Sequence, residues 1–536
     1  MYLSGVLMTP AHEYDWLIIG SGFGGSVSAL RLSEKGYRVA VLEAGRRRAD
    51  AEYAESTWDL RNYLWAPRLG MRGILELTRF HDIFIASGAG VGGGSTVYAN
   101  TLYRAKPAFF ENPQWRGLAD WASVLAPHYD TAERMLGVQR VPYESSGQRL
   151  LQEVGAAFGC AHTYTPTPVG VFFGEPGREV PDPYFGGEGP SRTGCTRCGA
   201  CMVGCRVGAK NTLLKNYLWF AERRGATVLP DREVVEIRPL GDGTGRDGYA
   251  VTTQRPGAWL DRDVRTITAK GVVVSAGALG TNRLLLRCKT GGALPRLSDR
   301  LGELVRTNSE SILAITLPDD ATQPWFDVAI SASIHPDADT HIEFCTYGRH
   351  GDFMSLLLAP LTGRGTRVTR PLKLLGAILR HPLRALRGLW PAGWSRRSLV
   401  LLVMQSSDNA IAFRPSRGPL GFRLRTEQDR ARPNPTFIPV ANAVAEWLAE
   451  RTGGTAHSSV FEATMNIPTT AHILGGAVIG ADASRGVVDA RLRAFGYEDL
   501  LIVDGSTMPA NPGVNPSLSI TALAEYAMAQ VPAARA

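Results

Sequence analysis

The most constraining feature of this sequence is a glycine-rich loop set between two apolar stretches near its start. Residues 14–19 have the length and composition of a buried strand, the loop 20–25 (Gly-Ser-Gly-Phe-Gly-Gly) follows at once, and a helix-forming stretch continues to about residue 35. A second apolar strand covers residues 37–42 and ends at Glu43. Strand, glycine turn, helix and a strand closed by an acid form the pattern of a dinucleotide-binding unit. The sequence therefore predicts an α/β fold with a Rossmann-like lobe.

Each position of this motif has a physical role in holding a nucleotide. Gly20 allows the tight turn, Gly22 lets backbone amides approach a pyrophosphate, and Gly25 lets the helix pack on the strand. The N-terminus of the helix favours the anion. Glu43 lies 23 residues after Gly20, where a carboxylate accepts hydrogen bonds from both ribose hydroxyls. The motif alone does not distinguish FAD from NAD.

Three later segments complete the predicted nucleotide lobe. The second glycine cluster, residues 88–95, has room only for backbone, so a flat ring or a diphosphate can lie against it; the alternative is a flexible surface hairpin. Residues 271–286 run from a short apolar strand through small residues into a helix. Residues 500–505 form another apolar strand followed by Asp-Gly, and 513–517 (Gly-Val-Asn-Pro-Ser) precede a final helix. We expect the early and late parts of the chain to meet in one lobe.

These four segments, in this order, resemble the glucose–methanol–choline (GMC) family of flavin oxidoreductases, and most of all its cholesterol oxidase-like branch. The resemblance covers most of the chain except about residues 350–400. It implies FAD rather than NAD, buried between a Rossmann-like lobe and a discontinuous α+β substrate lobe. The implied FAD lobe is 1–110, 190–305 and 470–536, and the implied substrate and cap lobe is 111–189 and 306–469.

The resemblance also assigns cofactor contacts by motif position. The ADP portion would be held by Gly20, Gly22, Gly25 and Glu43, while Gly94 and Ser95 would lie near the flavin, Val235 would contact adenine through its backbone, and Asp504 and Gly505 would meet the flavin side. One departure from the family is Tyr98, which replaces the usual polar residue three places after the loop serine.

The implied chemistry is oxidation of an alcohol, in which a base takes the hydroxyl proton while hydride leaves for the flavin. His472 matches the family's histidine base, although Ile473 replaces the proline that usually follows it. Asn515 matches the partner that hydrogen-bonds the substrate oxygen. Cholesterol oxidases also carry an acid that shifts the steroid double bond, and Glu343 is the positional match; a surface carboxylate is the alternative.

Three functions remain open from these residues. The first is FAD-dependent oxidation of a bulky apolar alcohol, above all a 3β-hydroxysteroid such as cholesterol, with steroid isomerisation as an extra activity. The second is an FAD alcohol dehydrogenase acting on long-chain alcohols or sugars with an iron–sulfur relay. The third is a flavin or metal protein that transfers electrons without performing catalysis.

Four of the seven cysteines are crowded into one short run, Cys195, Cys198, Cys201 and Cys205. The spacing is that of a bacterial ferredoxin loop, with Arg206 in place of the usual proline. An iron–sulfur cluster, free thiols and zinc are the three interpretations, and the crowding disfavours zinc because its cysteine pairs usually stand about 12 or more residues apart. With a cluster, the electron acceptor would be a protein or a quinone. Without one, it would be dioxygen.

A second unusual segment, residues 364–397, holds nine basic residues and no acidic one, so it accounts for the whole net charge of +8. The positive charge is confined to this one segment, and the sequence contains no motif that reads the grooves of DNA or RNA. Both observations argue against nucleic acid as a partner. On a helical wheel one face gathers the apolar residues Leu372, Leu375, Leu379, Leu383, Leu386 and Trp390. This amphipathic insert is interpreted either as a peripheral contact with an anionic membrane or as a cap packed on the substrate lobe.

The cysteine usage also predicts a compartment. A ferredoxin-like run is typical of a reducing environment rather than of a disulfide scaffold. The first sixteen residues lack the basic start and apolar run of a signal peptide, and no 18-residue apolar span occurs. We therefore expect a cytoplasmic protein, with peripheral membrane contact through the basic insert.

Overall fold

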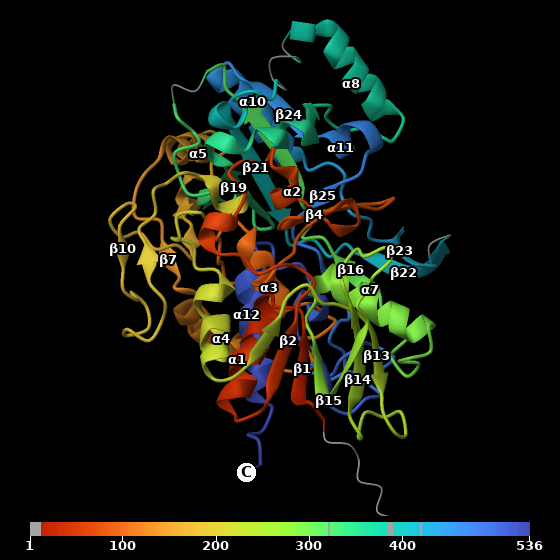
Figure 1. The fold of residues 1–536 in the computed structure, drawn as a ribbon. Coiled ribbons are helices and arrows are strands. Elements are labelled where there is room, and N and C mark those ends of the chain that lie inside the picture. Colours follow the sequence, from red (N-terminus) through yellow and green to blue (C-terminus); the bar gives the residue numbers. More distant parts are fainter. Residues whose placement is uncertain (1–11, 320–321, 384, 386–389, 419–420, 536) are drawn as a thin grey trace, which may run out of the picture.

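The computed structural model describes residues 12–319, 322–383, 385, 390–418 and 421–535. Two large sheets organise this part of the chain, and Figure 1 shows them one above the other, with the N-terminal strands in the lower one. The lower sheet is mixed. Its strands run in the order β12 (Thr227–Leu229), β2 (Val39–Leu42), β1 (Tyr14–Ile19), β15 (Arg265–Val274), β14 (Tyr249–Gln254) and β13 (Glu233–Pro239), with β27 (Leu500–Ile502) paired to the end of β15.

The lower sheet has the predicted Rossmann-like arrangement. Strands β12, β2, β1, β15 and β27 pair in parallel, whereas β15, β14 and β13 form an antiparallel meander at one edge. The central parallel strands β2, β1 and β27, with the end of β15, are apolar and largely buried because helices cover both of their faces. The pairing of β27 with β15 confirms that early, middle and late segments of the chain meet in one sheet.

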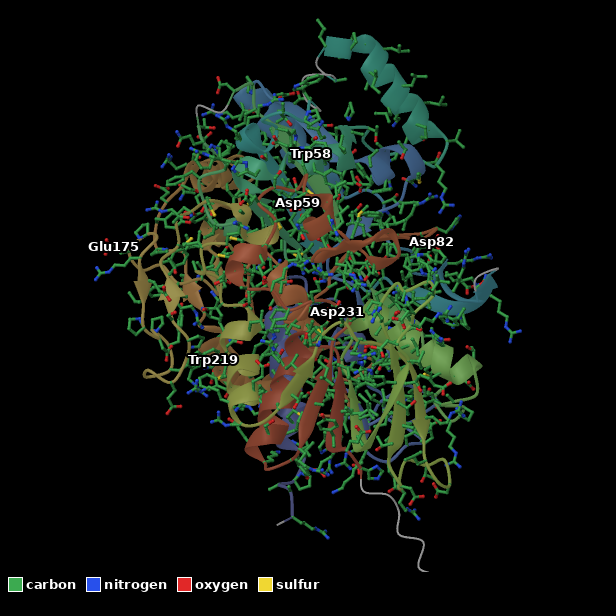
Figure 2. All side chains as sticks on the ribbon, in the orientation of Figure 1. Trp58, Asp59, Asp82, Glu175, Trp219 and Asp231 are labelled. Carbon is green, nitrogen blue, oxygen red and sulfur yellow. The ribbon has the colours of Figure 1, made fainter. Side chains whose placement is uncertain are left out.

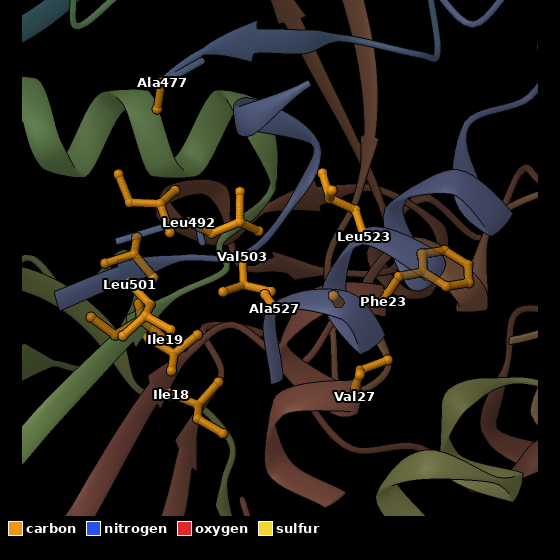
Figure 3. Packing of buried hydrophobic residues seen from close by; sticks show 14 of the residues in the cluster. Ile18, Ile19, Phe23, Val27, Ala477, Leu492, Leu501, Val503, Leu523 and Ala527 are labelled. Atoms are coloured by element: carbon orange, nitrogen blue, oxygen red, sulfur yellow. The ribbon is translucent and has the colours of Figure 1, made fainter. Parts of the chain in front are cut away.

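Helix α1 (Phe23–Glu34) begins directly after Gly22 and packs on the sheet together with α12 (Ser517–Ala529). Figure 3 shows the contact from close by, with Phe23 and Val27 of α1 near Leu523 of α12. Both helices are small-residue rich, which allows close approach of their backbones to the strands. The N-terminal unit and the last helix therefore share one core.

The upper sheet is antiparallel throughout and comes from the middle of the chain. Its strands run in the order β20 (Leu358–Pro360), β24 (Thr455–Ser459), β17 (Ser311–Thr316), β21 (Ser398–Gln405), β19 (Thr340–Cys345), β18 (Ile330–Ile334) and β8 (Thr165–Pro166). Helices α10 (Pro439–Thr452) and α5 (Ser146–Ala157) bury its apolar side chains in a second core. Strand β19, which carries Glu343, is buried along its whole length.

Short strands connect the two large sheets. Strand β25 (Thr469–Thr470) pairs in parallel with β6 (Phe84–Gly88), next to β5 (Leu75–Arg79). Strand β26 (Leu474–Gly476) pairs with β16 (Glu303–Arg306), which also contacts the β-hairpin of β22 (Ile411–Gly418) and β23 (Gly421–Gln428). His472 lies between β25 and β26, so it is held at the join of the sheets. The residue boundaries of the two predicted lobes stay a prediction.

Side chains fill the space between these elements (Figure 2). Asp231, near the middle of that view, accepts a hydrogen bond from Arg72 at 2.7 Å, and its N–H donates to the carbonyl of Gly45 at 3.2 Å. The turn before β13 is thereby fixed against the loop that follows β2. Within the described ranges, no helix combines the length and the apolar character needed to cross a bilayer.

Candidate functional site

The predicted glycine loop is shaped by its neighbours in the way that its spacing implies. A Cβ on Gly20 would lie 2.2 Å from the carbonyl oxygen of Ser275, and one on Gly25 would lie 2.0 Å from the carbonyl oxygen of Gly20. At Gly22, by contrast, a Cβ would meet no atom within 4 Å. Gly20 and Gly25 therefore cannot carry a side chain without a clash with the protein's own backbone. Gly22, in contrast, borders open space at the N-terminus of α1.

Glu43 is buried and binds the glycine loop. Its carboxylate accepts hydrogen bonds from Ser21 Oγ at 2.6 Å, from Ser21 N at 3.1 Å and from Gly45 N at 2.8 Å. Burial raises the pKa of this carboxyl despite those donors. Ser21 Oγ also accepts a bond from the N–H of Gly92 at 3.0 Å, so the second glycine cluster lies against the first.

Among the other predicted cofactor residues, some leave their backbone accessible to a ligand, and others use their side chains in hydrogen bonds within the protein. Gly94 has only the ring of Phe23 within 4 Å of its would-be Cβ, at 3.7 Å. Ser95 is buried, and its Oγ donates to Gly92 O at 2.7 Å and accepts from Leu213 N at 3.1 Å. Val235 falls at a break in register between β13 and β14, which leaves it outside the ladder pairs.

Asp504 and Gly505 follow β27 at the same edge of the sheet. Asp504 is buried and accepts bonds from Thr281 Oγ1 at 2.6 Å and Ser506 N at 2.8 Å. Its side chain therefore shapes the loop that carries Gly505. The open faces of the two glycine loops and the unpaired backbone at Val235 fit a dinucleotide such as FAD.

A buried polar cluster lies on the other side of the join, centred on Glu343. Asn515 Nδ2 donates a hydrogen bond to Glu343 Oε2 at 3.3 Å. His341 Nε2 lies 3.2 Å from Glu343 Oε1 but lacks the alignment of a hydrogen bond. The side chain of Glu343 is fully buried, so the alternative of a surface carboxylate is wrong.

His472 is held from the opposite side by a second buried acid. Its Nδ1 lies 3.2 Å from Glu310 Oε2. The same carboxylate oxygen accepts hydrogen bonds from Thr470 Oγ1 at 2.7 Å and from Ala471 N at 2.8 Å. This contact leaves the other ring nitrogen of His472, Nε2, for a different partner.

The charges of this cluster act on one another. Burial raises the pKa of Glu343 to about 8 against the lowering influence of Asn515 and His472. Burial alone would lower the pKa of His472, but the carboxylate of Glu310, helped by that of Glu343, raises it. Burial also lowers the pKa of His341 to about 3, so this imidazole is neutral. The structure thus brings the predicted residues His472, Asn515 and Glu343 into one electrostatically coupled group.

Several buried oxygens of the cluster have no hydrogen-bond partner among the described residues, namely Asn515 Oδ1, Glu343 Oε1 and Glu310 Oε1. A buried polar atom without a partner costs about 1–3 kcal/mol, so such atoms mark a place for a ligand group. A hydroxyl group, which donates one hydrogen bond and accepts others, is a ligand group that can pair with such atoms.

Comparison with known proteins gives this geometry a family. Two models of GMC oxidoreductases match residues 191–301 and 425–524, and a model of an NAD(P)-binding Rossmann-like domain matches residues 18–49. A cholesterol oxidase of Mycobacterium tuberculosis is 51% identical over 530 residues, which cover 96% of this chain and 90% of that protein. A cholesterol oxidase of Acinetobacter baumannii is 44% identical over 97% of this chain and 95% of its own.

The chain belongs to the GMC oxidoreductase family. This confirms the family and the α/β fold that the sequence predicts. As a GMC oxidoreductase it is an FAD-dependent enzyme that acts on CH–OH groups. Solved structures agree on the fold. A pyridoxine 4-oxidase from Mesorbium loti aligns with a TM-score of 0.61 at 16% identity, covering 96% of this chain and 98% of its own, and a fungal aryl-alcohol oxidase aligns with 0.59 at 14%, covering 97% and 98%.

Sequence reasoning missed residues 306–310, the segment that supports both halves of the buried polar cluster in this GMC oxidoreductase. Glu310 contacts His472, whereas Asn308 holds the loop that carries Asn515. Asn308 N–H donates to Asn511 Oδ1 at 2.8 Å, and Asn308 Nδ2 donates to Val514 O at 3.0 Å. The only signal was the polar run Thr-Asn-Ser-Glu between two apolar strands.

The four clustered cysteines of the GMC oxidoreductase converge on one place, while remaining unbonded to each other. Cys195, Cys198, Cys201 and Cys205 line one common pocket and form no disulfide bond. Within the described part of the chain, no three His, Cys, Asp or Glu side chains are positioned to share one metal ion. This geometry does not support the zinc alternative, and it leaves the iron–sulfur alternative a hypothesis.

Proposed function

We propose that this enzyme oxidises the 3β-hydroxyl group of a sterol such as cholesterol to a ketone. The buried cluster of His472, Asn515 and Glu343 carries the proposal, because its polar atoms without partners suit a ligand hydroxyl group. Relatives at 51% and 44% identity are cholesterol oxidases, which favours a sterol over the long-chain alcohols and sugars that the sequence leaves open.

In this proposal each side chain has a distinct task. The carboxylate of Glu310 lies 3.2 Å from Nδ1 of His472 without the alignment of a hydrogen bond, and its charge favours the proton on that nitrogen. The lone pair of Nε2 is then available to take the hydroxyl proton. Asn515 donates one Nδ2 hydrogen to Glu343 and can donate the other to the substrate oxygen, whose proton goes to His472. FAD, when bound, accepts the hydride. The chain itself binds, orients and deprotonates the alcohol, and the raised pKa of His472 limits the rate at low pH.

Glu343 supports a second step for a steroid substrate, the shift of the double bond after oxidation. A carboxyl whose pKa is raised to about 8 exchanges protons readily near neutral pH. Replacing Glu343 with Gln removes this exchange but keeps an oxygen and a donor in place. We expect Glu343→Gln to accumulate the unconjugated ketone, whereas the wild-type enzyme forms the conjugated one, which absorbs ultraviolet light. Equal conjugated product from both proteins would contradict this role.

Anaerobic titration tests the proposed substrate. Purified protein is mixed with cholesterol, a long-chain alcohol or a sugar while the absorbance of oxidised flavin is followed. Bleaching by cholesterol supports the proposal, bleaching only by the other alcohols assigns a different substrate, and no bleaching by any alcohol supports a non-catalytic protein. The matched control is Asn112→Ala, a surface asparagine outside the cluster, which leaves bleaching unchanged.

Dioxygen is the acceptor that we propose first, because the relatives at 51% and 44% identity bear the name oxidase. Hydrogen peroxide formed in proportion to ketone tests it. Ketone formation without peroxide, supported instead by a one-electron dye, would point to a dehydrogenase.

The basic insert supports a proposal about how the substrate arrives. Helix α8 (Thr369–Arg380) stands away from the body at the top of Figure 1 and packs through its base near α11 (Val460–Met465). Arg370 is buried there and donates to the carbonyl oxygen of Glu462. Arg367 reaches Asp82, labelled in Figure 2, at 3.5 Å. These two arginines therefore anchor the helix rather than face a partner.

The free face of α8 is apolar and its surroundings are basic. Leu372, Leu375 and Leu379 are 64%, 53% and 70% exposed. Lys373 and Arg380 are exposed beside them, and no acidic residue occurs between Asp352 and Asp408. We propose that this face rests on an anionic bilayer, where each basic side chain adds about 1 kcal/mol. Leu386 and two of the predicted basic residues, Arg384 and Arg387, lie outside the described residues.

Binding to vesicles tests the membrane proposal. The triple variant Leu372→Ser, Leu375→Ser, Leu379→Ser is compared with the control Trp259→Ser, Leu260→Ser, which removes equally exposed apolar side chains elsewhere. Sedimentation with phosphatidylglycerol vesicles should fall several-fold for the first variant and stay unchanged for the control. Equal binding by all proteins, or binding to neutral vesicles as strong as to anionic ones, would refute the assignment.

A further inference from the structure

We propose that Cys195, Cys198, Cys201 and Cys205 hold an iron–sulfur cluster, through which this flavoenzyme passes electrons one at a time to an acceptor. The proposal goes beyond the oxidation itself, and it uses the one motif that the catalytic site leaves unexplained. Of the remaining cysteines, Cys160 and Cys288 are buried in other parts of the core, and Cys345 packs beside the cysteine segment, where its Sγ donates to Met202 Sδ at 3.7 Å.

The first support is the cavity that the four cysteines share. Besides the cysteines, the pocket is lined by small or apolar residues, by Lys210 and by Asp327. Four unpaired thiols that face one pocket can supply all the thiolate ligands that a cluster of iron and sulfide needs.

The second support is the backbone that carries the cysteines. Residues 194–208 contain one short 3₁₀ turn, η5 (Ala200–Met202), and otherwise wind irregularly around the cavity. Arg197 adopts a left-handed conformation with φ 54°, and its N–H donates to Cys195 Sγ at 3.4 Å. An N–H···S contact of this kind stabilises a thiolate bound to a cluster and is one of the interactions that set its potential.

The placement of the thiols distinguishes a cluster from a single ion. A zinc ion binds four thiolates at about 2.3 Å, which forces the sulfur atoms together. In the described part of the chain no three ligand side chains are positioned around one ion, although the four thiols face one cavity. A multinuclear cluster holds its cysteines farther apart, since each binds a different iron atom.

The third support is the route from this cavity to the predicted flavin loop. Lys210 is buried and its Nζ donates to the carbonyl oxygens of Cys201 at 2.9 Å, Thr96 at 3.0 Å and Tyr98 at 2.8 Å. Thr96 directly follows Ser95 in the second glycine loop. One side chain thus spans the cysteine segment and the loop, and its positive charge favours an anionic cluster.

The electron balance is simple. Oxidation of one CH–OH group to C=O releases two electrons and two protons. A cluster accepts one electron at a time, so two molecules of a one-electron carrier protein are reduced for each alcohol oxidised, and the protons go to solvent. This use of the cluster rests on the proposed alcohol oxidation, whereas the presence of the cluster does not.

The test is metal analysis of the full chain purified without oxygen. We expect about 3 or 4 iron atoms and about 4 acid-labile sulfides per chain, and an electron paramagnetic resonance signal in either the oxidised or the dithionite-reduced protein. The double variant Cys198→Ser, Cys201→Ser should lose iron, sulfide and signal. The matched control Cys160→Ser, Cys288→Ser changes two buried thiols outside the cavity and should keep all three.

Three results would overturn the proposal: iron and sulfide near zero in wild-type protein even after anaerobic reconstitution, zinc in place of iron, or full cluster content in the Cys198→Ser, Cys201→Ser variant. If that variant fails to fold, the wild-type metal content still decides. Bleaching of flavin by cholesterol is recorded on the same samples. Loss of bleaching with intact iron would defeat the proposed oxidation alone, and absent iron with intact bleaching would defeat the cluster alone.

Discussion

The proposed nucleotide cradle and the proposed catalytic cluster of this enzyme are built in opposite ways. The cradle uses backbone: Gly20, Gly22 and Gly25 lie within six residues, and their lack of side chains is what matters. The cluster uses side chains that come from four distant segments, at Glu310, Glu343, His472 and Asn515. The cradle should therefore fail when atoms are added, and the cluster when functional groups are removed.

The largest effect should come from removing functional groups. His472→Ala and Asn515→Leu should each slow flavin reduction by cholesterol about 10²-fold or more, because the substrate loses its base or the amide that donates to its oxygen. Rapid mixing without oxygen measures the rate. Both variants should bind FAD in full, since neither residue lies in the cradle. A normal rate in either variant would remove that residue from the catalytic cluster.

Adding a single methyl group should have different effects at two glycines of the cradle. Gly20→Ala places Cβ against the carbonyl oxygen of Ser275 at a φ of 97°, so a loss of stability of about 3 kcal/mol is expected. Gly22→Ala meets no protein atom, so the apoprotein should keep its melting temperature.

For the Gly22 variant the loss should appear in FAD affinity, measured by fluorescence titration of apoprotein, because the methyl group enters the space assigned to the pyrophosphate. Full affinity in Gly22→Ala would move the cofactor away from this loop.

Glu310 is proposed to act on the reaction only through its contact with His472. Glu310→Gln keeps the shape and removes the charge that raises the pKa of His472. The base then loses its proton at lower pH, so the acid limb of the kcat profile should move to lower pH, while kcat falls about 10-fold or more. A profile of kcat against pH checks this. Restoring the charge with Glu310→Asp should move the limb back, which a merely structural role would not do.

The smallest expected effect is on stability. Glu343 has a folded-state pKa raised to about 8 from 4.5, so its protonated form stabilises the fold below pH 4.5, and that contribution is lost as pH rises towards 8. Glu343→Gln has no such titration. Its melting temperature should depend less on pH than that of the wild type, by about 1–3 °C across this window. Parallel curves would show that Glu343 is not buried as described.

The difference between cradle and cluster also explains which of these residues could be predicted from the sequence. The cradle was predicted in detail because a glycine turn and the strand and helix beside it are local in sequence. His472, Asn515 and Glu343 were found only through the family resemblance, since nothing in the composition around them distinguishes a catalytic side chain from a structural one. Glu310 and Asn308 were missed because their roles arise from contacts with residues more than 150 positions away.

The sequence by itself determined the Rossmann-like unit, the family and the unusual cysteine and arginine segments, because these depend on spacing along the chain. The tertiary structure decided which polar groups share a buried site, that Arg370 anchors α8 instead of facing outwards, and that four thiols meet at one cavity. Burial and long-range pairing change the pKa and the partners of a side chain, and neither is encoded in its immediate neighbours.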